Sequence, residues 1–576
     1  MRKEYLSLKN YLYVGFSFFF LVSARLGIFS PELVRGTFIG GIGVLVLLEK
    51  ILNKRYLVDI KKSINYQDVI FSTLMLLATL YFIFEFPNIG RRAGLPNNWD
   101  IFFGTVVVGL SLEVTRRKTG YPLFIIGLVF FLYNFLGPYL PGVLSHGGFS
   151  LSRTMGFLYT SLYGVYGRVT QIFATYVFMF VLFGSVMRAT GAAKFFVDLP
   201  YMLTYNSRGA AAKSAVIASG IMGSVSGSAV ANVMTTGIFT IPLIKKSGYK
   251  DYEAAAIETA ASTGGQLIPP IMGAGAFVMA ELTGIPYSKI IVVSIVPALL
   301  YFFSLIIIVH REGLKKDLIK KEMKEEDRIN KSKELVKNGW FYFIPILLLF
   351  FLLFFGYSPV YSAFWAVIIN LVTTFIFRRR EVSLAKILSA FEEGTENILL
   401  VGSVVGTIGI IIGTVYLTGL GLKFSGLILS LSFGYLPLMI VLVALASYVL
   451  GMGLTVTSSY IILAVLAAPA LTEAGVSLLG AHLIIFWLSQ DANITPPVCL
   501  AAYAAAGIAK ADPIKTGWTS LRYAKVIYIV PILMAYTPIL LEGNPLEVVV
   551  WIAVSFIGLG ILSYLNSWVA EKFEKK

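Results

Sequence analysis

A pair of motifs that occurs twice constrains the fold of this chain more than any other feature. The first copy is GSVSGSAVAN (223–232) followed by QLIPP (266–270), and the second is GMGLTVTS (451–458) followed by NITPP (493–497). The glycine motifs begin 228 positions apart, and the Pro-Pro pairs lie 227 positions apart. Both copies place helix-breaking and hydroxyl-bearing residues inside long apolar stretches. At membrane depth, such backbone is tolerated only where protein covers it or where it lines a cavity.

The apolar stretches themselves predict an all-α polytopic membrane protein. Of the 576 residues, 57% are hydrophobic and 14% are charged, and a soluble domain could not cover so much apolar surface. We expect about 14 transmembrane helices plus two re-entrant helical hairpins. The expected spans are 11–29, 36–52, 68–86, 101–114, 121–141, 166–187, 252–283, 289–309, 340–357, 359–378, 396–419, 478–508, 524–541 and 546–566.

The charge distribution predicts the orientation of these spans. With a cytoplasmic N-terminus, the cytoplasmic segments hold 39 of the 47 Lys and Arg residues, as the positive-inside rule requires. This predicts a multi-pass protein of the cell (inner, cytoplasmic) membrane with both termini in the cytoplasm. The net charge of +16 is therefore a signal of topology, and we expect no binding to nucleic acid.

Two segments, 207–244 and 435–472, are predicted to be hairpins that enter and leave the membrane on one side. Each apolar arm has about 13–16 residues, or about 20–24 Å of helix, whereas the hydrocarbon core is about 30 Å thick. Two short tilted helices packed through small residues are the alternative for either hairpin. By the predicted topology, the first hairpin enters from the cytoplasm and the second from outside. The two copies are therefore expected to be inverted-topology repeats, a pattern typical of secondary transporters.

The repeats suggest a division into four parts. We expect a small four-helix scaffold module (1–118), a first repeat (119–309) with hairpin 207–244 and broken helix 252–283, and a second repeat (339–576) with hairpin 435–472 and broken helix 478–508. Between the repeats lies a charged cytoplasmic connector, 310–338, with ten basic and seven acidic residues interleaved. Such a segment is typical of a solvated helix, with a regulatory arm as the alternative.

Broken helices expose carbonyl oxygens and half-helix dipoles, which coordinate small cations and anionic groups. Oxygen ligands suit a hard cation such as sodium. Each repeat is therefore predicted to hold one ion site. Site one comprises Ser224, Ser226, Gly227, Ser228, Asn232, Thr263, Gly264, Gly265, Gln266 and Pro269. Site two comprises Gly451, Gly453, Thr455, Thr457, Ser458, Asp491, Asn493, Thr495 and Pro496. Between them, substrate is expected to meet Ser226, Thr455, Gln266 and Asn493.

Two acidic residues lie inside apolar runs, where an ionisable group is a candidate functional residue. Asp491 is expected to ligate a cation or to carry a coupling proton, with a structural role at a half-helix N-terminus as the alternative. Glu258 is expected either to function similarly or to pair with a lysine near the inner membrane surface.

An enzyme is a weaker interpretation of the motifs. No histidine lies in either motif, so the serines lack a base, and Ser226 lacks the frame of a nucleophile elbow. No phosphate-binding loop occurs, and Cys499 is the single cysteine. We therefore expect no catalytic residues and no cofactor. A membrane-embedded enzyme acting on lipid remains the alternative from a different class.

The motifs resemble those of a known family. The 223–232 segment, STGGQLIPPIMG (262–273) and NITPPVCLAAYAAAGIA (493–509) resemble the large membrane subunit of tripartite ATP-independent periplasmic (TRAP) transporters, over about 120–570. The resemblance is closest to fused permeases that work with TAXI-type binding proteins. Residues 1–118 are similar to the small subunit only in the number and order of spans.

The resemblance implies a sodium-coupled importer of organic acids that moves its substrate by an elevator mechanism. It also implies a separate extracytoplasmic substrate-binding protein as partner, with the two ion sites at the hairpin tips and broken helices. Because Asp491 cannot be matched to a position of the family, a proton remains an alternative coupling ion, either beside sodium or in its place. A divalent-anion-type sodium/carboxylate symporter, which needs no binding protein, shares the inverted hairpin architecture and is the alternative within the same class.

Overall fold

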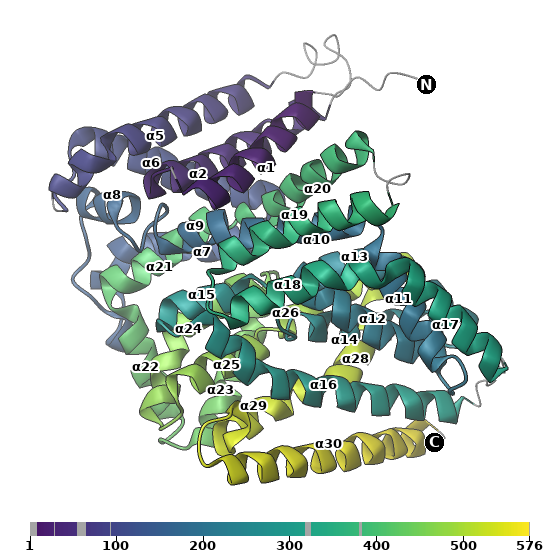
Figure 1. The fold of residues 1–576 in the computed structure, drawn as a ribbon. Helices are drawn as coiled ribbons and strands as arrows, with labels where there is room; N and C mark the ends of the chain where they lie inside the picture. The colour runs from purple at the N-terminus through teal and green to yellow at the C-terminus, as the bar shows by residue number, and fades with distance from the viewer. Residues whose placement is uncertain are drawn as a thin grey trace. The chain divides into compact units, whose positions relative to one another are not determined.

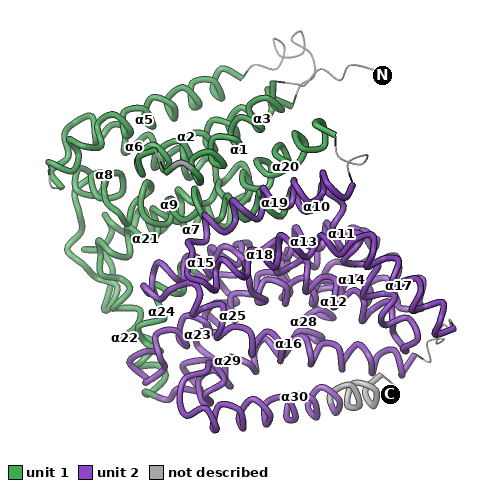
Figure 2. The backbone as a smooth tube through the Cα atoms, in the orientation of Figure 1, with its two compact units in different colours: residues 1–185, 383–434, 461–470 green, residues 186–382, 435–460, 471–576 purple. Residues whose placement is uncertain are grey.

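The computed structural model describes residues 8–27, 29–53, 65–92, 94–316, 324–378 and 383–574, and within these ranges the regular secondary structure is entirely helical (Figure 1). The helices form two compact units, shown in different colours in Figure 2. Unit 1 comprises 1–185, 383–434 and 461–470, and unit 2 comprises 186–382, 435–460 and 471–576.

Unit 1 contains eleven α-helices that lie wholly within it among the described residues. They are α1 (Leu8–Leu26), α2 (Pro31–Leu47), α3 (Glu49–Leu52), α5 (Tyr66–Arg91), α6 (Asn98–Thr119), α7 (Tyr121–Leu136), α8 (Leu151–Thr160), α9 (Arg168–Ile172), α20 (Leu384–Gly402), α21 (Val405–Thr418) and α22 (Leu420–Leu431). Two helices, α10 (Phe178–Ala189) and α24 (Val456–Glu473), have residues in both units.

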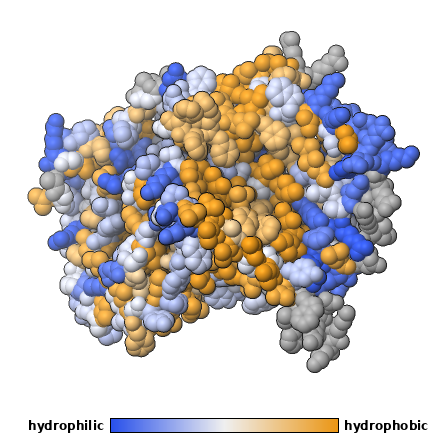
Figure 3. All heavy atoms as spheres, turned by 60° about the horizontal axis from the view of Figure 1, so that its bottom comes forward, coloured by the Kyte–Doolittle hydropathy of each residue, from blue (hydrophilic) through white to orange (hydrophobic). Residues whose placement is uncertain are grey.

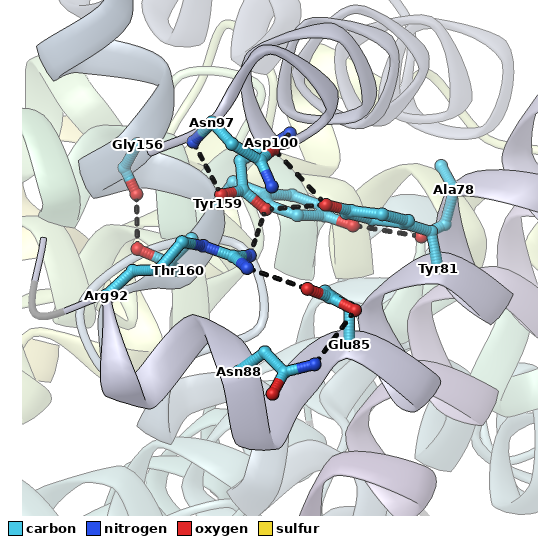
Figure 4. Close-up of polar contacts among 10 residues, drawn as sticks. All are labelled: Ala78, Tyr81, Glu85, Asn88, Arg92, Asn97, Asp100, Gly156, Tyr159 and Thr160. Carbon is cyan, nitrogen blue, oxygen red and sulfur yellow. Dashed lines mark hydrogen bonds and ion pairs between the residues drawn. The ribbon is translucent and has the colours of Figure 1, made fainter. Parts of the chain in front are cut away.

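A buried carboxylate connects α5, the loop that follows α5 and the start of α6 in unit 1 (Figure 4). Asp100, in the first turn of α6, is only 1% exposed. It forms a capping box with Asn97 and accepts hydrogen bonds from Tyr81 of α5 (3.0 Å) and from Arg92 (2.9 Å). Arg92 also pairs with Glu85 of α5 at 2.7 Å. The buried acid is thus stabilised by a cation, a hydroxyl and a backbone amide, as a charge away from water requires.

Unit 2 contains the remaining helices. They are α11 (Ala192–Thr204), α12 (Ala210–Ser226), α13 (Ala229–Lys246), α14 (Asp251–Gly265), α15 (Ala274–Thr283), α16 (Tyr287–Lys315), α17 (Glu325–Gly339), α18 (Phe343–Phe354), α19 (Pro359–Arg378), α23 (Leu436–Gly451), α25 (Leu478–Leu488), α26 (Asp491–Ile494), α27 (Leu500–Ala509), α28 (Pro513–Ala524), α29 (Val526–Tyr536) and α30 (Pro545–Glu574). Helices α12, α13, α14, α27 and α28 pack against one another and form the centre of this unit.

Nine helical segments among the described residues are long and apolar enough to cross a membrane. They are Tyr66–Arg91, Tyr121–Tyr139, Arg168–Ala189, Tyr287–Lys315, Glu325–Phe354, Pro359–Arg378, Leu384–Thr418, Val456–Glu473 and Pro545–Leu565. The predicted spans 252–283 and 478–508 are missing from this set because each is divided into helices of 15 residues or fewer. The set also lacks the predicted spans 11–29, 36–52, 101–114 and 524–541, and it includes Val456–Glu473, an arm of the second predicted hairpin. Hydrophobic side chains cover much of the face in Figure 3, and α30 exposes Val549, Trp551 and Ile557 to the outside. An apolar surface of this extent fits a lipid environment.

The two predicted hairpins are pairs of helices. The arms α12 and α13 have 17 and 18 residues, and α23 and α24 have 16 and 18. Three of the four arms are longer than the predicted 13–16 residues, and α23 is within that range. At about 1.5 Å per residue, all four remain shorter than the hydrocarbon core of about 30 Å. In the connector 310–338, residues 317–323 lie outside the described residues, while α17 shows that the part after them is helical, as predicted.

Candidate functional site

The tip of the first hairpin is a sharp turn between α12 and α13. Gly227 follows the last turn of α12 with a φ of +62°, a left-handed conformation that glycine adopts without steric cost. The next residue, Ser228, caps α13, because its hydroxyl accepts a hydrogen bond from the Ala231 amide at 3.3 Å. The GSVSGSAVAN motif therefore encodes a helix end and a helix start separated by a single glycine.

The Pro-Pro break after α14 packs directly against this tip. The Gln266 side-chain amide donates to the Gly227 carbonyl at 2.9 Å, and the Ile271 amide donates to the Ser224 carbonyl at 3.2 Å. One turn deeper, the backbones of Gly223 and Gly265 touch, since a Cβ on Gly223 would lie 2.5 Å from the Gly265 Cα. The structure thus brings the two halves of predicted site one together.

Asn232 lies within this first site and is only 1% exposed. Its side-chain nitrogen donates to the Ser219 carbonyl at 2.8 Å and to the Ser262 hydroxyl at 3.1 Å. Its side-chain oxygen, Oδ1, accepts no hydrogen bond from any described residue. A buried polar atom that lacks a partner calls for an explanation, and an unseen ligand is one of the recognised explanations.

The second site is built from the tip between α23 and α24 and from the break around α26. Helix α23 ends at Gly451, and Gly453 turns the chain with a φ of +90°. The Thr455 hydroxyl lies 2.9 Å from the Ser458 hydroxyl and accepts a hydrogen bond from the Ser458 amide at 3.3 Å. A Cβ on Gly451 would lie 3.3 Å from the amide nitrogen of Ala492, so this tip also packs closely against its break.

Asp491 begins the short helix α26 and is 2% exposed. One carboxylate oxygen, Oδ1, accepts hydrogen bonds from Thr495 at 3.1 Å and from the Tyr528 hydroxyl. The other, Oδ2, has no hydrogen-bond partner among the described residues. Predicted site two therefore matches site one in holding a single buried oxygen without a donor.

The two breaks are joined by one side-chain hydrogen bond. The Asn493 side-chain nitrogen donates to the Gln266 side-chain oxygen at 2.8 Å, and both residues belong to unit 2. They lie 227 positions apart, the same spacing as Pro269 and Pro496, so equivalent positions of the two motif copies meet. Two of the four residues predicted to contact substrate are therefore in direct contact with each other.

Several predicted site residues use their side chains locally. The Ser224 hydroxyl donates to the Ile221 carbonyl, and the Thr263 hydroxyl donates to the Thr259 carbonyl, both at 2.8 Å. The Ser226 hydroxyl makes a long contact of 3.4 Å with the Ser228 carbonyl. In these three residues the side chain stabilises its own helix or turn. Gly264 packs against the ring of Tyr301, and Thr457 is buried on α24. Pro269 and Pro496 lie in the two breaks, and each is followed by a cis peptide bond.

The expectation that Glu258 pairs with a lysine is wrong. Four hydroxyl groups surround its carboxylate, from Ser219, Thr236, Thr240 and Ser262, and it forms no ion pair with a described residue. Ser262 lies one turn from Glu258 on the same helix, but the hydroxyls of Ser219, Thr236 and Thr240 were not predicted. Thr236 and Thr240 lie four residues apart on one face of α13 and could have indicated a polar stripe. Nothing in the sequence pointed to Tyr528 as a partner of Asp491.

The fold and the paired broken helices are those of a membrane transporter, and comparison with known proteins identifies its family. The model of the tripartite ATP-independent periplasmic transporter, DctM component, matches residues 106–540. The chain therefore belongs to this family, whose members are multi-pass large permeases that work with a periplasmic substrate-binding protein.

Individual relatives are distant. The chain is 24% identical to the 2,3-diketo-L-gulonate TRAP transporter large permease protein YiaN of Escherichia coli K12, over 58% of this chain and 76% of that protein. It is 23% identical to the C4-dicarboxylate TRAP transporter large permease protein DctM of Vibrio cholerae, over 69% and 89%. Among solved structures, the YdaH transporter of Alcanivorax borkumensis matches 72% of this chain and 98% of its own, with a TM-score of 0.50 and 14% identity. That last likeness concerns the fold alone.

Proposed function

We propose that this chain imports an organic acid by sodium-coupled elevator transport, receiving its substrate from a separate extracytoplasmic binding protein of the TAXI type. C4-dicarboxylates and a sugar-derived acid in the names of the relatives support a carboxylate as substrate. The first 105 residues lie outside the family match, and we propose that they serve as a fused small subunit, since helices α1, α2, α5 and α6 lie in or begin within this segment.

The observation that carries the proposal is the pair of buried oxygens without donors. Asn232 Oδ1 stands at the first break and Asp491 Oδ2 at the second. Each is 1–2% exposed at the residue level, and each lies beside a helix tip and an unwound segment. Oxygen atoms of this kind are the ligands that hard cations prefer, and leaving them buried without a partner costs about 1–3 kcal/mol each.

The two sites differ in charge. A cation at site two would meet the carboxylate of Asp491, whereas a cation at site one would meet the neutral amide of Asn232. Because the Coulomb attraction to a carboxylate exceeds that to an amide dipole, we propose that site two binds sodium more tightly. A proton that replaces sodium would also act at Asp491, the one ionisable residue of the two predicted sites.

The test uses the purified chain in proteoliposomes and in detergent. Thermal unfolding is measured in NaCl and in choline chloride at equal ionic strength, for the wild type, Asn232→Ala and Asp491→Asn. Sodium at about ten times the Kd of a site should stabilise the wild type by about 1.4 kcal/mol through that site. Both variants should lose part of this stabilisation, and Asp491→Asn should lose more.

Transport itself is measured as uptake of radiolabelled succinate under an imposed sodium gradient or an imposed proton gradient. Uptake that requires the sodium gradient and an added TAXI-type binding protein supports the proposal. Uptake without any binding protein would favour the divalent-anion-type symporter. Uptake driven by the proton gradient alone would show that the proton, and not sodium, is the coupling ion.

A further inference from the structure

Glu258 lies in the middle of α14, is 0% exposed and is surrounded by hydroxyl groups from three helices. Its Oε1 atom accepts hydrogen bonds from Thr236 at 2.6 Å, from Ser219 at 2.7 Å and from Ser262 at 3.0 Å. Its Oε2 atom accepts a hydrogen bond from Thr240 at 2.6 Å. The carboxylate therefore connects α12, α13 and α14, the two arms of the first hairpin and the helix that precedes the first break.

The hydrogen bonds around Asn232 fix the orientation of its amide. A backbone carbonyl can only accept, so the Asn232 atom 2.8 Å from the Ser219 carbonyl must be the nitrogen. Its second contact is the Ser262 hydroxyl at 3.1 Å. A serine hydroxyl has one proton to donate, and Glu258 accepts the proton of Ser262. The Ser262 oxygen is then left to accept from Asn232, which turns Asn232 Oδ1 away from both partners.

We propose that Glu258 is a positioning residue for the first ion site, an inference that rests on the proposed sodium coupling. By taking the Ser262 proton, Glu258 makes Ser262 an acceptor for the Asn232 nitrogen. This arrangement presents Asn232 Oδ1 as a free ligand for the cation. If the Ser262 hydroxyl donated to Asn232 instead, the amide would have to flip. Oδ1 would then be occupied by Ser262, and the Ser219 carbonyl would lose its donor.

A glutamine at position 258 separates this role from a role of the negative charge. Its side-chain oxygen keeps the three hydrogen bonds from Ser219, Thr236 and Ser262, so Asn232 keeps its orientation. The new amide nitrogen donates to the Thr240 hydroxyl, whose own proton has another acceptor in the Thr236 carbonyl at 3.0 Å. Glu258→Gln thus removes the charge and leaves the positioning contacts in place.

The experiment measures the Kd of sodium by titrating NaCl against choline chloride and following thermal unfolding of the purified full chain in detergent. Ser262→Ala removes one of the two contacts that orient Asn232, and the Kd of sodium should rise about three- to tenfold, the effect of one hydrogen bond. Glu258→Leu leaves Ser262 without its acceptor and should raise the Kd by a similar factor, whereas Glu258→Gln keeps that acceptor and should stay within about twofold of the wild type. Thr240→Val serves as the matched control, because it removes a hydroxyl that binds Glu258 but does not touch Ser262 or Asn232.

The melting temperature without sodium separates positioning from a merely structural role. A purely structural contact would lower that temperature in Ser262→Ala and leave the Kd unchanged, which would overturn the proposal. A Kd that rises as much in Glu258→Gln as in Ser262→Ala would also overturn it, in favour of a charge effect. A wild type whose unfolding does not respond to sodium would instead reject the proposed coupling ion, and the role of Glu258 with it.

Discussion

The crossing of α12 and α14 at Gly223 and Gly265 offers a sharp test of how the first site is held together. A Cβ on Gly223 would lie 2.5 Å from the Cα and 3.0 Å from the carbonyl carbon of Gly265, and 3.1 Å from the side-chain nitrogen of Asn232. Non-bonded carbon atoms prefer about 3.5–4.0 Å. Because the obstructing atoms are mostly backbone, Gly223→Ala must push the two helices apart by about 1 Å or more.

The expected cost follows from two opposing effects. Overpacking of a closely packed contact costs about 1–3 kcal/mol, whereas replacing glycine by alanine inside a helix stabilises by about 0.5–1 kcal/mol. The net loss in the free energy of unfolding should be about 0.5–2 kcal/mol. Gly507 of α27 is the matched control, since nothing lies within 4 Å of its Cβ position. Gly507→Ala should therefore raise the free energy of unfolding by about 0.5–1 kcal/mol, the stabilisation that alanine gives over glycine inside a helix.

Thermal unfolding can be followed through the single cysteine. Cys499 is 0% exposed, so a maleimide dye should react with it only as unit 2 opens. We expect the melting temperature to fall in Gly223→Ala and to stay equal or rise in Gly507→Ala. Sodium should also bind more weakly to Gly223→Ala, because the displaced helix carries Asn232's partner Ser219. Equal melting temperatures for Gly223→Ala and the wild type would refute the close crossing.

Two further predictions concern the second break. In a double-mutant cycle, Gln266→Ala and Asn493→Ala should show a coupling energy of about 0.5–1.5 kcal/mol in unfolding, and strictly additive effects would contradict their hydrogen bond. Tyr528→Phe removes a donor from the buried carboxylate of Asp491 and should lower the free energy of unfolding by about 1.5–3 kcal/mol. Its control, Tyr503→Phe, removes a more exposed hydroxyl that bonds to a backbone carbonyl, and should cost less than half as much in the same assay.

The parts of the site that follow from local chemistry could be predicted from sequence. Proline has no amide proton and disfavours a helical residue before it, so helix ends near Pro269 and Pro496 follow from these residues alone. Gly227 likewise marks a helix end. The all-helical fold followed from the length and polarity of the apolar stretches, whereas the number of spans did not. The breaks divide 252–283 and 478–508 into short helices, and four other predicted spans do not combine the length and the hydropathy of a membrane-crossing helix.

The parts that depend on helix register could not be predicted. Three of the four partners of Glu258 come from positions 219, 236 and 240, and only the packing of α12 and α13 against α14 brings their hydroxyls to one carboxylate. A lysine seemed the natural partner because a buried acid needs compensation, but four neutral donors supply it instead. Tyr528 is 37 residues from Asp491, and no spacing rule connects a tyrosine at that distance to an acid.

The meeting of Gln266 and Asn493 explains how two unequal sites can act together under the proposed mechanism. Asn493 donates to the Gln266 oxygen, and the Gln266 nitrogen donates to the Gly227 carbonyl, so a line of amides runs from the second break to the first hairpin tip. If the two motif copies are inverted repeats, as the sequence predicts, their equivalent positions contact each other only close to the two-fold axis that relates them. A substrate carboxylate bound there would interact with both amides at once. Through the same hydrogen bonds, a movement of the first hairpin tip would displace the break beside Asp491. Under this proposal, a cation at the acidic second site would favour the arrangement of Gly227 that the neutral first site needs. The difference in charge between the copies would then give the two proposed ions an order of binding.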